Sequence, residues 1–355
     1  MLNYIIRRIL LMVPTVIGIT LVTFFVMYMS PGGVGGSLLN ESGQMRPDER
    51  AAREKYLNER FGLKQPFIVQ YGKWLNHVLP VGFKEPGEGF PKSIGFGFKS
   101  PDLGRSFTRE RPVTDMIAEA LPITLALNLL TLPIIYGISI SSGILTAVKK
   151  GTSIDVSIGI VLIALWSLPG MWVGVMMIGF LANRDFLPLF PTGGLSSPQA
   201  SGWAFFPSYD NVGWLVDRLW HLAAPIVVLT YGGFAFLSKL TRGQMLENLA
   251  ADYVRTARAK GQAEQVILFR HVLRNSILPL ITVSSSILPG LLGGSAIIEN
   301  IFSIDGMGKM MLQAINVRDR EVVLSITLVI AIISTVSLLI ADLCYVLADP
   351  RVSYE

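Results

Sequence analysis

A polar, basic stretch over residues 252–279 separates two long apolar runs of the chain. Its first part joins cationic and small apolar side chains in one short segment: Tyr253, Val254, Arg255, Thr256, Ala257, Arg258, Ala259, Lys260 and Gly261. The chemistry this segment suggests is recognition, because an amphipathic helix can lie in a groove of a partner protein. A basic helix can equally rest on anionic lipid headgroups. The pattern leaves both interpretations open.

The spacing of apolar residues predicts how this stretch folds. Over 243–260 they recur at steps of three and four, as on one face of a helix: Leu246, Leu249, Ala250, Tyr253, Val254 and Ala257. Gly261 then permits a turn that a side chain would resist. Beyond it, Val266, Phe269 and Leu273 share a helical face. We therefore expect two short helices hinged at Gly261.

Residues for metal or nucleophilic chemistry are sparse. His77, His221 and His271 are far apart and form no metal-ligand pattern. The only cysteine, Cys344, lies in an apolar run, which predicts a small buried hydrophobic residue rather than a disulfide. These features predict no metal site and no catalytic residues.

The sequence lacks the residue patterns of two kinds of enzyme site. An intramembrane protease or lipid-modifying transferase would need a catalytic constellation at bilayer depth, but the serines at 284–286 share their run with no His, Asp or Lys. A nucleotide-binding loop of the form Gly-x-x-x-x-Gly-Lys-Ser/Thr is also missing, since Gly72-Lys73 and Gly308-Lys309 lack the rest of it. The sequence therefore favours a chain that is not an enzyme.

The composition is that of a polytopic membrane protein. The chain has 355 residues, of which 51% are hydrophobic and only 15% charged, and its mean hydropathy is +0.52. Soluble proteins carry about 25% charged residues. The net charge of +5 is typical of basic cytoplasmic loops rather than of nucleic-acid binding.

Apolar runs long enough to cross a bilayer predict an all-α protein with six transmembrane helices. They lie at 9–29, 120–148, 156–182, 222–238, 275–298 and 322–341. The first is too long for a signal peptide and has no small-residue cleavage site. An even number of spans, together with the basic residues at 149–150 and 239–274, places both termini in the cytoplasm.

The segment over 31–118 is expected outside the membrane, opposite the N-terminus. Residues 46–60 have the signals of an exposed helix that ends at Gly62. A second short helix is predicted over 67–78, and the Pro/Gly-rich stretch near 80–101 predicts an irregular loop.

The predicted spans are uncharged over most of their length, which bears on the energy source. Intramembrane charges usually mark ion or proton pathways. Their scarcity disfavours an ion-coupled secondary transporter, although backbone carbonyls can also bind sodium. An energy source outside the membrane part is favoured.

Tyr253 to Gly261, followed by the segments 271–275 and 278–279, resembles the cytoplasmic loop of ABC-transporter permeases of the oligopeptide/dipeptide/nickel importer family. Further segments resemble that family in order and spacing: 4–8, 14–15, 61–66, 70–71, 102–106, 302–303, 306–308 and 348–351. Arg255-Thr256-Ala257 replaces the Glu-Ala-Ala of the general importer pattern, as in the peptide-importer branch. The stretch at 80–101 resembles an insertion relative to shorter members.

The resemblance implies a type I ABC importer permease in a bacterial inner membrane. Its domains would be an N-terminal helix at 1–30, an extracytoplasmic segment at 31–118 and a five-helix core at 119–349 with a coupling loop at 239–276. Its partners would be a second, homologous permease in a heterodimer, two ATPase subunits and an extracytoplasmic solute-binding protein. The chain itself would hold no cofactor, since ATP and Mg would bind to the ATPase subunits. The solute would be an oligopeptide, dipeptide, modified peptide, opine or nickel chelate.

Overall fold

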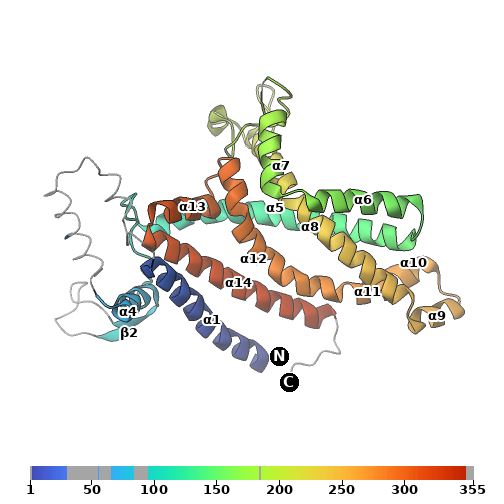
Figure 1. Cartoon of the computed structure of the whole chain (residues 1–355), viewed down its shortest axis with the longest axis horizontal. Coiled ribbons are helices and arrows are strands. Elements are labelled where there is room, and N and C mark those ends of the chain that lie inside the picture. Colours follow the sequence, from blue (N-terminus) through green and yellow to red (C-terminus); the bar gives the residue numbers. More distant parts are fainter. Residues whose placement is uncertain (1, 30–54, 56–64, 84–94, 184, 349–355) are drawn as a thin grey trace. The chain divides into compact units, whose positions relative to one another are not determined.

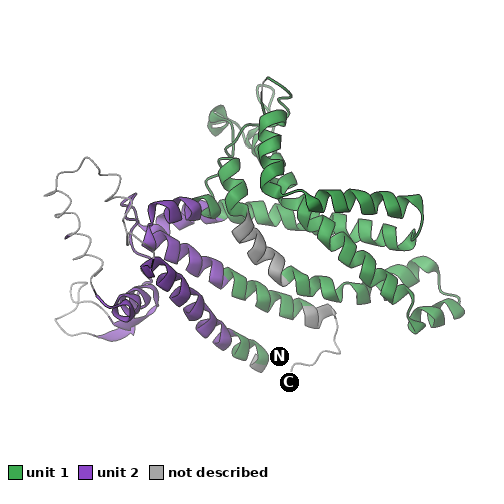
Figure 2. Ribbon diagram, in the orientation of Figure 1, with its two compact units in different colours: residues 1–8, 122–309, 333–355 green, residues 9–121, 310–332 purple. Residues whose placement is uncertain are grey.

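The computed structural model describes residues 2–29, 55, 65–83, 95–183 and 185–348. These residues are mostly helical (Figure 1). They divide into two compact units (Figure 2): unit 1 takes residues 1–8, 122–309 and 333–355, and unit 2 takes residues 9–121 and 310–332. Each unit is described by itself.

Unit 1 is built mainly from the central part of the chain. Its elements are α5 (Val113–Val148, from residue 122), α6 (Ser153–Ser167), α7 (Gly170–Met176), the π-helical turn η1 (Met177–Leu181), the 3-10 turn η2 (Pro198–Gly202), α8 (Trp214–Leu249), α9 (Asp252–Ala259), α10 (Glu264–Val266), the π-helical turn η3 (Ile267–Val272), α11 (Leu273–Ser276) and α12 (Leu278–Ile301). The ends of α1 (Leu2–Met29) and α14 (Arg320–Ala348) also belong to it.

In the part of the chain that the structure describes, four helices are long and apolar enough to cross a membrane, and two bent helix pairs raise the total to as many as six. The four contain Tyr4–Met29, Val113–Val148, Trp214–Leu249 and Arg320–Cys344. Long helices suit the bilayer because all their backbone groups are bonded internally. The predicted helical class is thus confirmed, and the six predicted spans are reached if each bent pair counts as one span. The third and fifth spans are not straight.

The third predicted span bends by 89° between Ser167 and Gly170, and the fifth by 42° beside Leu278. Pro169 has no N–H to continue α6, so the helix ends before it. Tyr231 of α8 donates its hydroxyl to the Leu168 carbonyl oxygen at 2.7 Å, which satisfies an acceptor at the break. The fourth span, predicted over 222–238, is part of a much longer helix, α8.

Helix α8 forms the centre of unit 1. Leu222, Val228 and Tyr231 of α8 share a buried apolar cluster with Ile298 and Phe302 from the end of α12. Helix α5 crosses α8 closely enough for the hydroxyls of Ser142 and Ser238 to lie 2.7 Å apart. A Cβ on Gly143 would lie 2.5 Å from that of Thr241, so glycine is required at this crossing. Small residues at such contacts let membrane helices approach one another.

Unit 2 contains α4 (Phe67–Val78), the strands β1 (Val81–Phe83) and β2 (Phe96–Phe98), most of α13 (Met307–Val317) and parts of α1, α5 and α14. Helix α4 has the predicted bounds. Its Tyr71 and Trp74 pack with Phe24 and Leu324 in a buried cluster, and the Tyr71 hydroxyl lies 3.1 Å from that of Thr20.

The irregular loop predicted over 80–101 is wrong at its two ends. Strands β1 and β2 form an antiparallel hairpin with Val81 opposite Phe98. The Asn76 side chain accepts a hydrogen bond from the N–H of Phe83 at 2.8 Å and donates one to the carbonyl oxygen of Phe83 at 3.0 Å. These two bonds hold the hairpin against α4. Each strand has a glycine at its centre, and these glycines favoured the prediction of a loop. The predicted helix over 46–60 and its end at Gly62 lie outside the described residues, apart from Lys55.

Two further expectations are corrected. The segment 299–320, between the fifth and sixth predicted spans, is more than a connecting loop: it contains helix α13, on which Met307, Met310 and Ala314 form a buried face. Cys344, predicted to be buried, is exposed on α14 in this single chain.

Candidate functional site

The segment after α8 does not continue that helix, so the prediction of one helix over 243–260 is wrong. Ala251 is extended, with φ −70° and ψ 151°, and α9 begins at Asp252. In an unbroken helix of about 3.6 residues per turn, Met245 and Val254 would point in opposite directions. The break lets α9 fold back so that both side chains enter one buried cluster.

Helix α9 is attached through two side chains. Val254 is 0% exposed and Ala257 is 8% exposed. They pack with Met245 of α8 and with Ile267 and Val272 of η3. The other residues of the predicted site are exposed: Tyr253, Arg255, Thr256, Arg258, Ala259, Lys260 and Gly261. A polar helical face is therefore held outward on a fixed apolar base.

The turn at Gly261 closes α9 with a defined set of hydrogen bonds. Gly261 has φ +73°, a left-handed conformation that favours glycine. Its N–H donates to the Arg258 carbonyl at 2.9 Å, and the N–H of Gln262 donates to the Ala257 carbonyl at 3.2 Å. These two bonds make a Schellman motif, the common glycine C-cap of helices. The predicted hinge is confirmed, and it is a structured turn.

The charges on the exposed face are largely paired. Arg258 donates to both carboxylate oxygens of Glu264, at 2.7 and 3.2 Å, across the Gly261 turn. This hydrogen bonding raises the pKa of the Arg258 guanidinium. Arg255 lies 3.3 Å from Asp252, and the Tyr253 hydroxyl donates to the Asn248 side chain at 2.8 Å. The surface presented is thus of mixed charge.

The residues that the second helix buries are not those of the apolar face predicted from Val266, Phe269 and Leu273. Ile267 and Val272 are buried, whereas Val266 and Phe269 are exposed. The cause is the π-helical turn η3, whose wider spacing shifts the register of every side chain in it. His271 places Nε2 2.9 Å from the Gln262 side-chain oxygen, so its ring is bonded within the loop.

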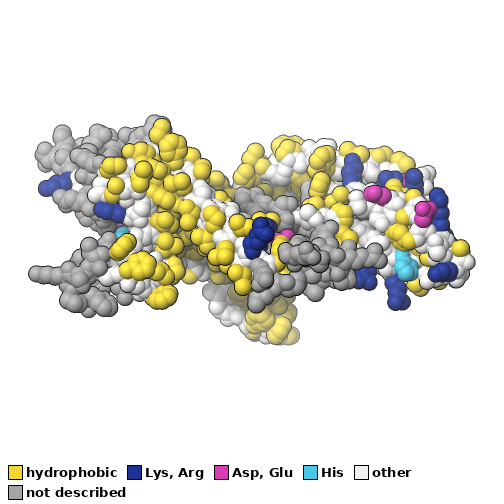
Figure 3. Space-filling view, turned by 90° about the horizontal axis from the view of Figure 1, so that it is seen from below, with side chains coloured by type: hydrophobic (Ala, Val, Ile, Leu, Met, Phe, Trp, Pro, Cys, Tyr) yellow, Lys and Arg dark blue, Asp and Glu magenta, His cyan; other side chains and the backbone are white. Residues whose placement is uncertain are grey.

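A salt bridge near this site was not anticipated from sequence. Arg242 of α8 donates from Nε and Nη2 to the two carboxylate oxygens of Asp155, each at 2.8 Å. The N–H of Gly151 donates to the same carboxylate at 3.0 Å. The available signal was a lone acid at the start of an apolar run that follows Lys149-Lys150. Figure 3 shows Lys and Arg side chains gathered at the end of unit 1 that carries α9 and α10.

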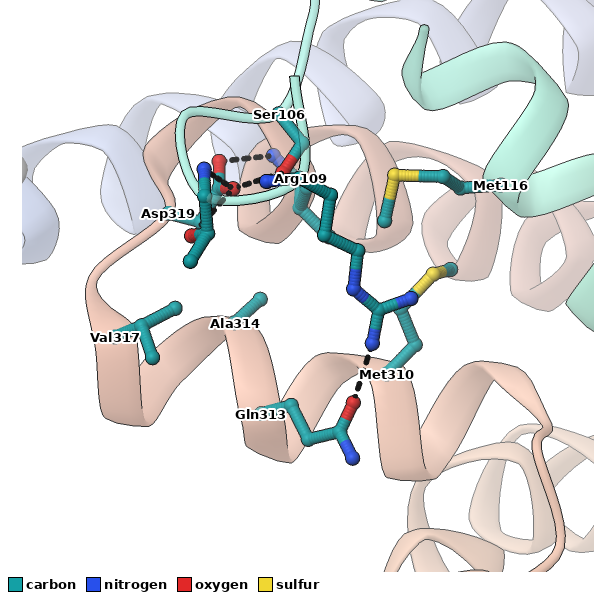
Figure 4. Close-up of a pocket in the computed structure, with 10 residues that line it drawn as sticks. Ser106, Arg109, Met116, Met310, Gln313, Ala314, Val317 and Asp319 are labelled. Atoms are coloured by element: carbon teal, nitrogen blue, oxygen red, sulfur yellow. Dashed lines mark hydrogen bonds between the residues drawn. The ribbon is translucent and has the colours of Figure 1, made fainter. Parts of the chain in front are cut away.

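In unit 2, two segments far apart in the sequence converge. Ser106 donates to the Asp319 carboxylate at 2.5 Å, and Arg320 donates to Gln70 at 3.0 Å. A Cβ on Gly104, which has φ +78°, would lie 3.0 Å from the Glu321 carboxylate. The segments 70–71 and 102–106 were noted as motifs, but their meeting with 319–321 could not be read from spacing. A pocket of about 340 Å³ lies beside this contact (Figure 4).

The helices that are long and apolar enough to cross a membrane, with the short helix α9 between α8 and α12, define a multi-pass membrane protein. Comparison with known families agrees with this class. Residues 139–354 match the model of the binding-protein-dependent transport system inner membrane component, and residues 1–128 match its N-terminal model. The chain belongs to this family.

Relatives match over nearly the whole chain. It is 34% identical over 352 residues to the oligopeptide transport system permease protein AppB of Bacillus subtilis, covering 99% of both chains. It is 32% identical to the dipeptide transport system permease protein DppB of Alkalihalophilus pseudofirmus, covering 100% of both. It is 31% identical to the peptidoglycan transport system permease protein YejB of Agrobacterium fabrum, covering 99% of this chain and 98% of the other.

Among solved structures, a chain of the inward-facing MetNI methionine ABC transporter shares the fold. The TM-score is 0.51 at 17% identity, with 66% of this chain and 97% of that chain covered. The chain is therefore an inner-membrane permease component of a binding-protein-dependent ABC importer. Because its relatives are permeases that work with separate ATPase subunits, it is a transporter subunit rather than an enzyme.

Proposed function

We propose that the chain forms half of the pathway by which a peptide or peptide-like solute is imported. The second half would be a homologous permease, the solute would arrive on an extracytoplasmic binding protein, and two ATPase subunits would bind ATP and Mg. The names of the relatives support a peptide solute, since oligopeptide, dipeptide and peptidoglycan transport all occur among them.

The observation that carries this proposal is the construction of α9. Two buried side chains and a Schellman turn fix the helix, while its remaining residues face outward. A helix that must transmit force from another protein needs such a rigid base. We therefore assign Tyr253 to Gly261 as the element that docks on an ATPase subunit.

Adsorption of α9 to lipid is the less favoured alternative. A membrane-surface helix needs an apolar face to bury in the headgroup region and free basic side chains to attract anionic lipid. The apolar residues Val254 and Ala257 are already buried against the protein. Arg255 and Arg258 are paired with Asp252 and Glu264. Little of α9 remains for lipid to bind.

The docking role requires α9 and both termini to face the cytoplasm. The topology can be measured in a Cys344→Ser variant, which removes the only native cysteine. Single cysteines then replace Lys260 and the fully exposed Tyr209. In intact cells, an impermeant thiol reagent is expected to label position 209 and to label position 260 only after lysis. The opposite labelling would overturn the assignment.

Transport is tested by reconstitution. The chain, its partner permease, the ATPase subunits and the binding protein, taken from neighbouring genes, are placed in liposomes with a labelled peptide. Uptake is expected only when ATP and every subunit are present. Peptide uptake by this chain alone, driven by an ion gradient, would refute the proposed function.

A further inference from the structure

The pocket in unit 2 has a form that suits a small ligand. It lies between the loop that precedes α5 and helix α13, and its volume of about 340 Å³ is near the lower end of the range for ligand sites (Figure 4). The space is enough for one or two amino-acid residues but too small for a longer peptide. A ligand there would insert one end and leave the rest outside.

One wall of the pocket is apolar and adaptable. Met116, Met310, Ala314 and Val322 line it, and each is at most 6% exposed. Methionine is unbranched and polarisable, so it adjusts to side chains of different shape. The wall can therefore accept a range of apolar groups.

The rim carries hydrogen-bond donors. The Arg109 guanidinium donates through Nη2 to the Gln313 side-chain oxygen at 2.7 Å, which holds the two side chains together over the pocket (Figure 4). Among the described residues, Nε and Nη1 of Arg109 and the amide nitrogen of Gln313 bond to no acceptor. A guanidinium presents parallel N–H groups that fit the two oxygens of a carboxylate.

The acid in the pocket, Asp319, is buried and hydrogen-bonded within the protein. Asp319 is only 2% exposed. Its carboxylate accepts hydrogen bonds from the Ser106 hydroxyl at 2.5 Å and from the N–H and hydroxyl of Thr108 at 3.3 and 3.2 Å. The same bonds fix the loop that carries Arg109, whose N–H donates to Ser106 Oγ at 3.0 Å. The donor rim is thus preorganised.

We infer that this pocket receives the C-terminal residue of the transported peptide, with its carboxylate on Arg109 and Gln313 and its side chain against Met116 and Met310. The inference rests on the proposed function of peptide import. Because the pocket is small, it contacts only one end of the peptide and places no limit on the peptide's length.

The test compares two peptides in the reconstituted complex, one with a free C-terminal carboxylate and one with the same sequence ending in an amide. Arg109→Gln removes the cation. Arg105→Gln is the matched control, because it removes an exposed cation from the same loop without touching the pocket. Since the binding protein is unchanged, its own preference cancels when the free-to-amide uptake ratio is compared between permease variants.

The ratio is expected to fall on the order of tenfold in Arg109→Gln, as the loss of a charge-assisted hydrogen bond implies, and to stay at the wild-type value in Arg105→Gln. An equal loss of uptake for both peptides would overturn the inference and point to contact with the binding protein instead. An unchanged ratio in Arg109→Gln would also overturn it. If the wild-type complex imports neither peptide, the proposed function itself fails.

Discussion

Glu299, near the end of α12, accepts a hydrogen bond at 2.9 Å from the backbone N–H of Lys309, in the first turn of α13. Its other carboxylate oxygen accepts from the Thr124 hydroxyl at 2.9 Å, and the Met307 N–H donates to Thr124 Oγ1 at 2.9 Å. A helix N-terminus has unbonded N–H groups and favours negative charge. The two side chains therefore cap α13 from two other helices.

Removing the Glu299 carboxylate should destabilise the protein. Glu299 is 0% exposed, so Glu299→Ala leaves buried donors without acceptors, at a cost of about 1–3 kcal/mol for each such group. Glu299→Gln keeps an acceptor oxygen and should lose less. Thermal unfolding of the detergent-purified chain measures both, with Glu247→Ala on the exposed face of α8 as the control. A melting temperature of wild-type value for Glu299→Ala would show that the cap is not needed.

Gly308 should not tolerate even alanine. A Cβ at this position would lie 2.4 Å from the Cα of Ala296, and backbone cannot move aside as a side chain can. Overpacking of this kind costs about 1–3 kcal/mol. Gly159→Ala in α6 is the matched control, because a Cβ there meets nothing within 4 Å. The melting temperature should fall for Gly308→Ala and stay level or rise for Gly159→Ala; equal values for the two would contradict the packing argument.

The helical class and the approximate spans could be predicted from sequence because lipid imposes one rule: a run that crosses it must be apolar and internally bonded. That rule does not determine how the polar ends of the helices pack against one another. The segment 306–308 was noted only as a motif, and its physical reason, the closeness of Glu299 and Ala296, appears only when α12 and α13 are placed together. The pairing of Arg242 with Asp155 could not be predicted either, because it appears only when α6 and α8 are placed together.

For α9 and the turn after it, the sequence predicted the helix and its glycine hinge but not which residues beyond the hinge are buried. Periodicity assumes an unbroken α-helix. The extended Ala251 and the π-helical turn η3 each shift the register, so Ile267 and Val272 are buried while Val266 and Phe269 are exposed. Both irregularities lie in residues with no glycine or proline to signal them.

The Arg242–Asp155 pair joins the first turn of α6 to α8, the helix that precedes α9. Arg242→Ala leaves the Asp155 carboxylate, which is 9% exposed at the side chain, without its cation, so the melting temperature should fall. Arg242→Lys should restore it only in part, because an ammonium cannot reproduce the two parallel bonds. Lys239→Ala, an exposed cation on the same helix, is the control. Full recovery in Arg242→Lys would mean that charge alone matters.

Gly261 offers the sharpest test of coupling. Its φ of +73° is unfavourable for residues with a side chain, and a Cβ there would meet nothing within 4 Å, so any effect of substitution comes from the backbone alone. A left-handed conformation costs a non-glycine residue about 1–2 kcal/mol, and asparagine tolerates it better than most residues. Gly261→Val should therefore open the Schellman turn and misplace α9, whereas Gly261→Asn should keep both.

In the reconstituted complex, the measured quantity is peptide imported for each ATP hydrolysed. We expect Gly261→Val to insert into the membrane and assemble but to lower this ratio severalfold, because ATPase motion reaches the membrane helices through a displaced α9. Gly261→Asn should keep the wild-type ratio, which separates the conformation of the turn from the loss of glycine as such. If Gly261→Val imports as much peptide for each ATP as the wild type, the turn does not transmit motion from the ATPase. The docking role would then have to lie elsewhere in the loop.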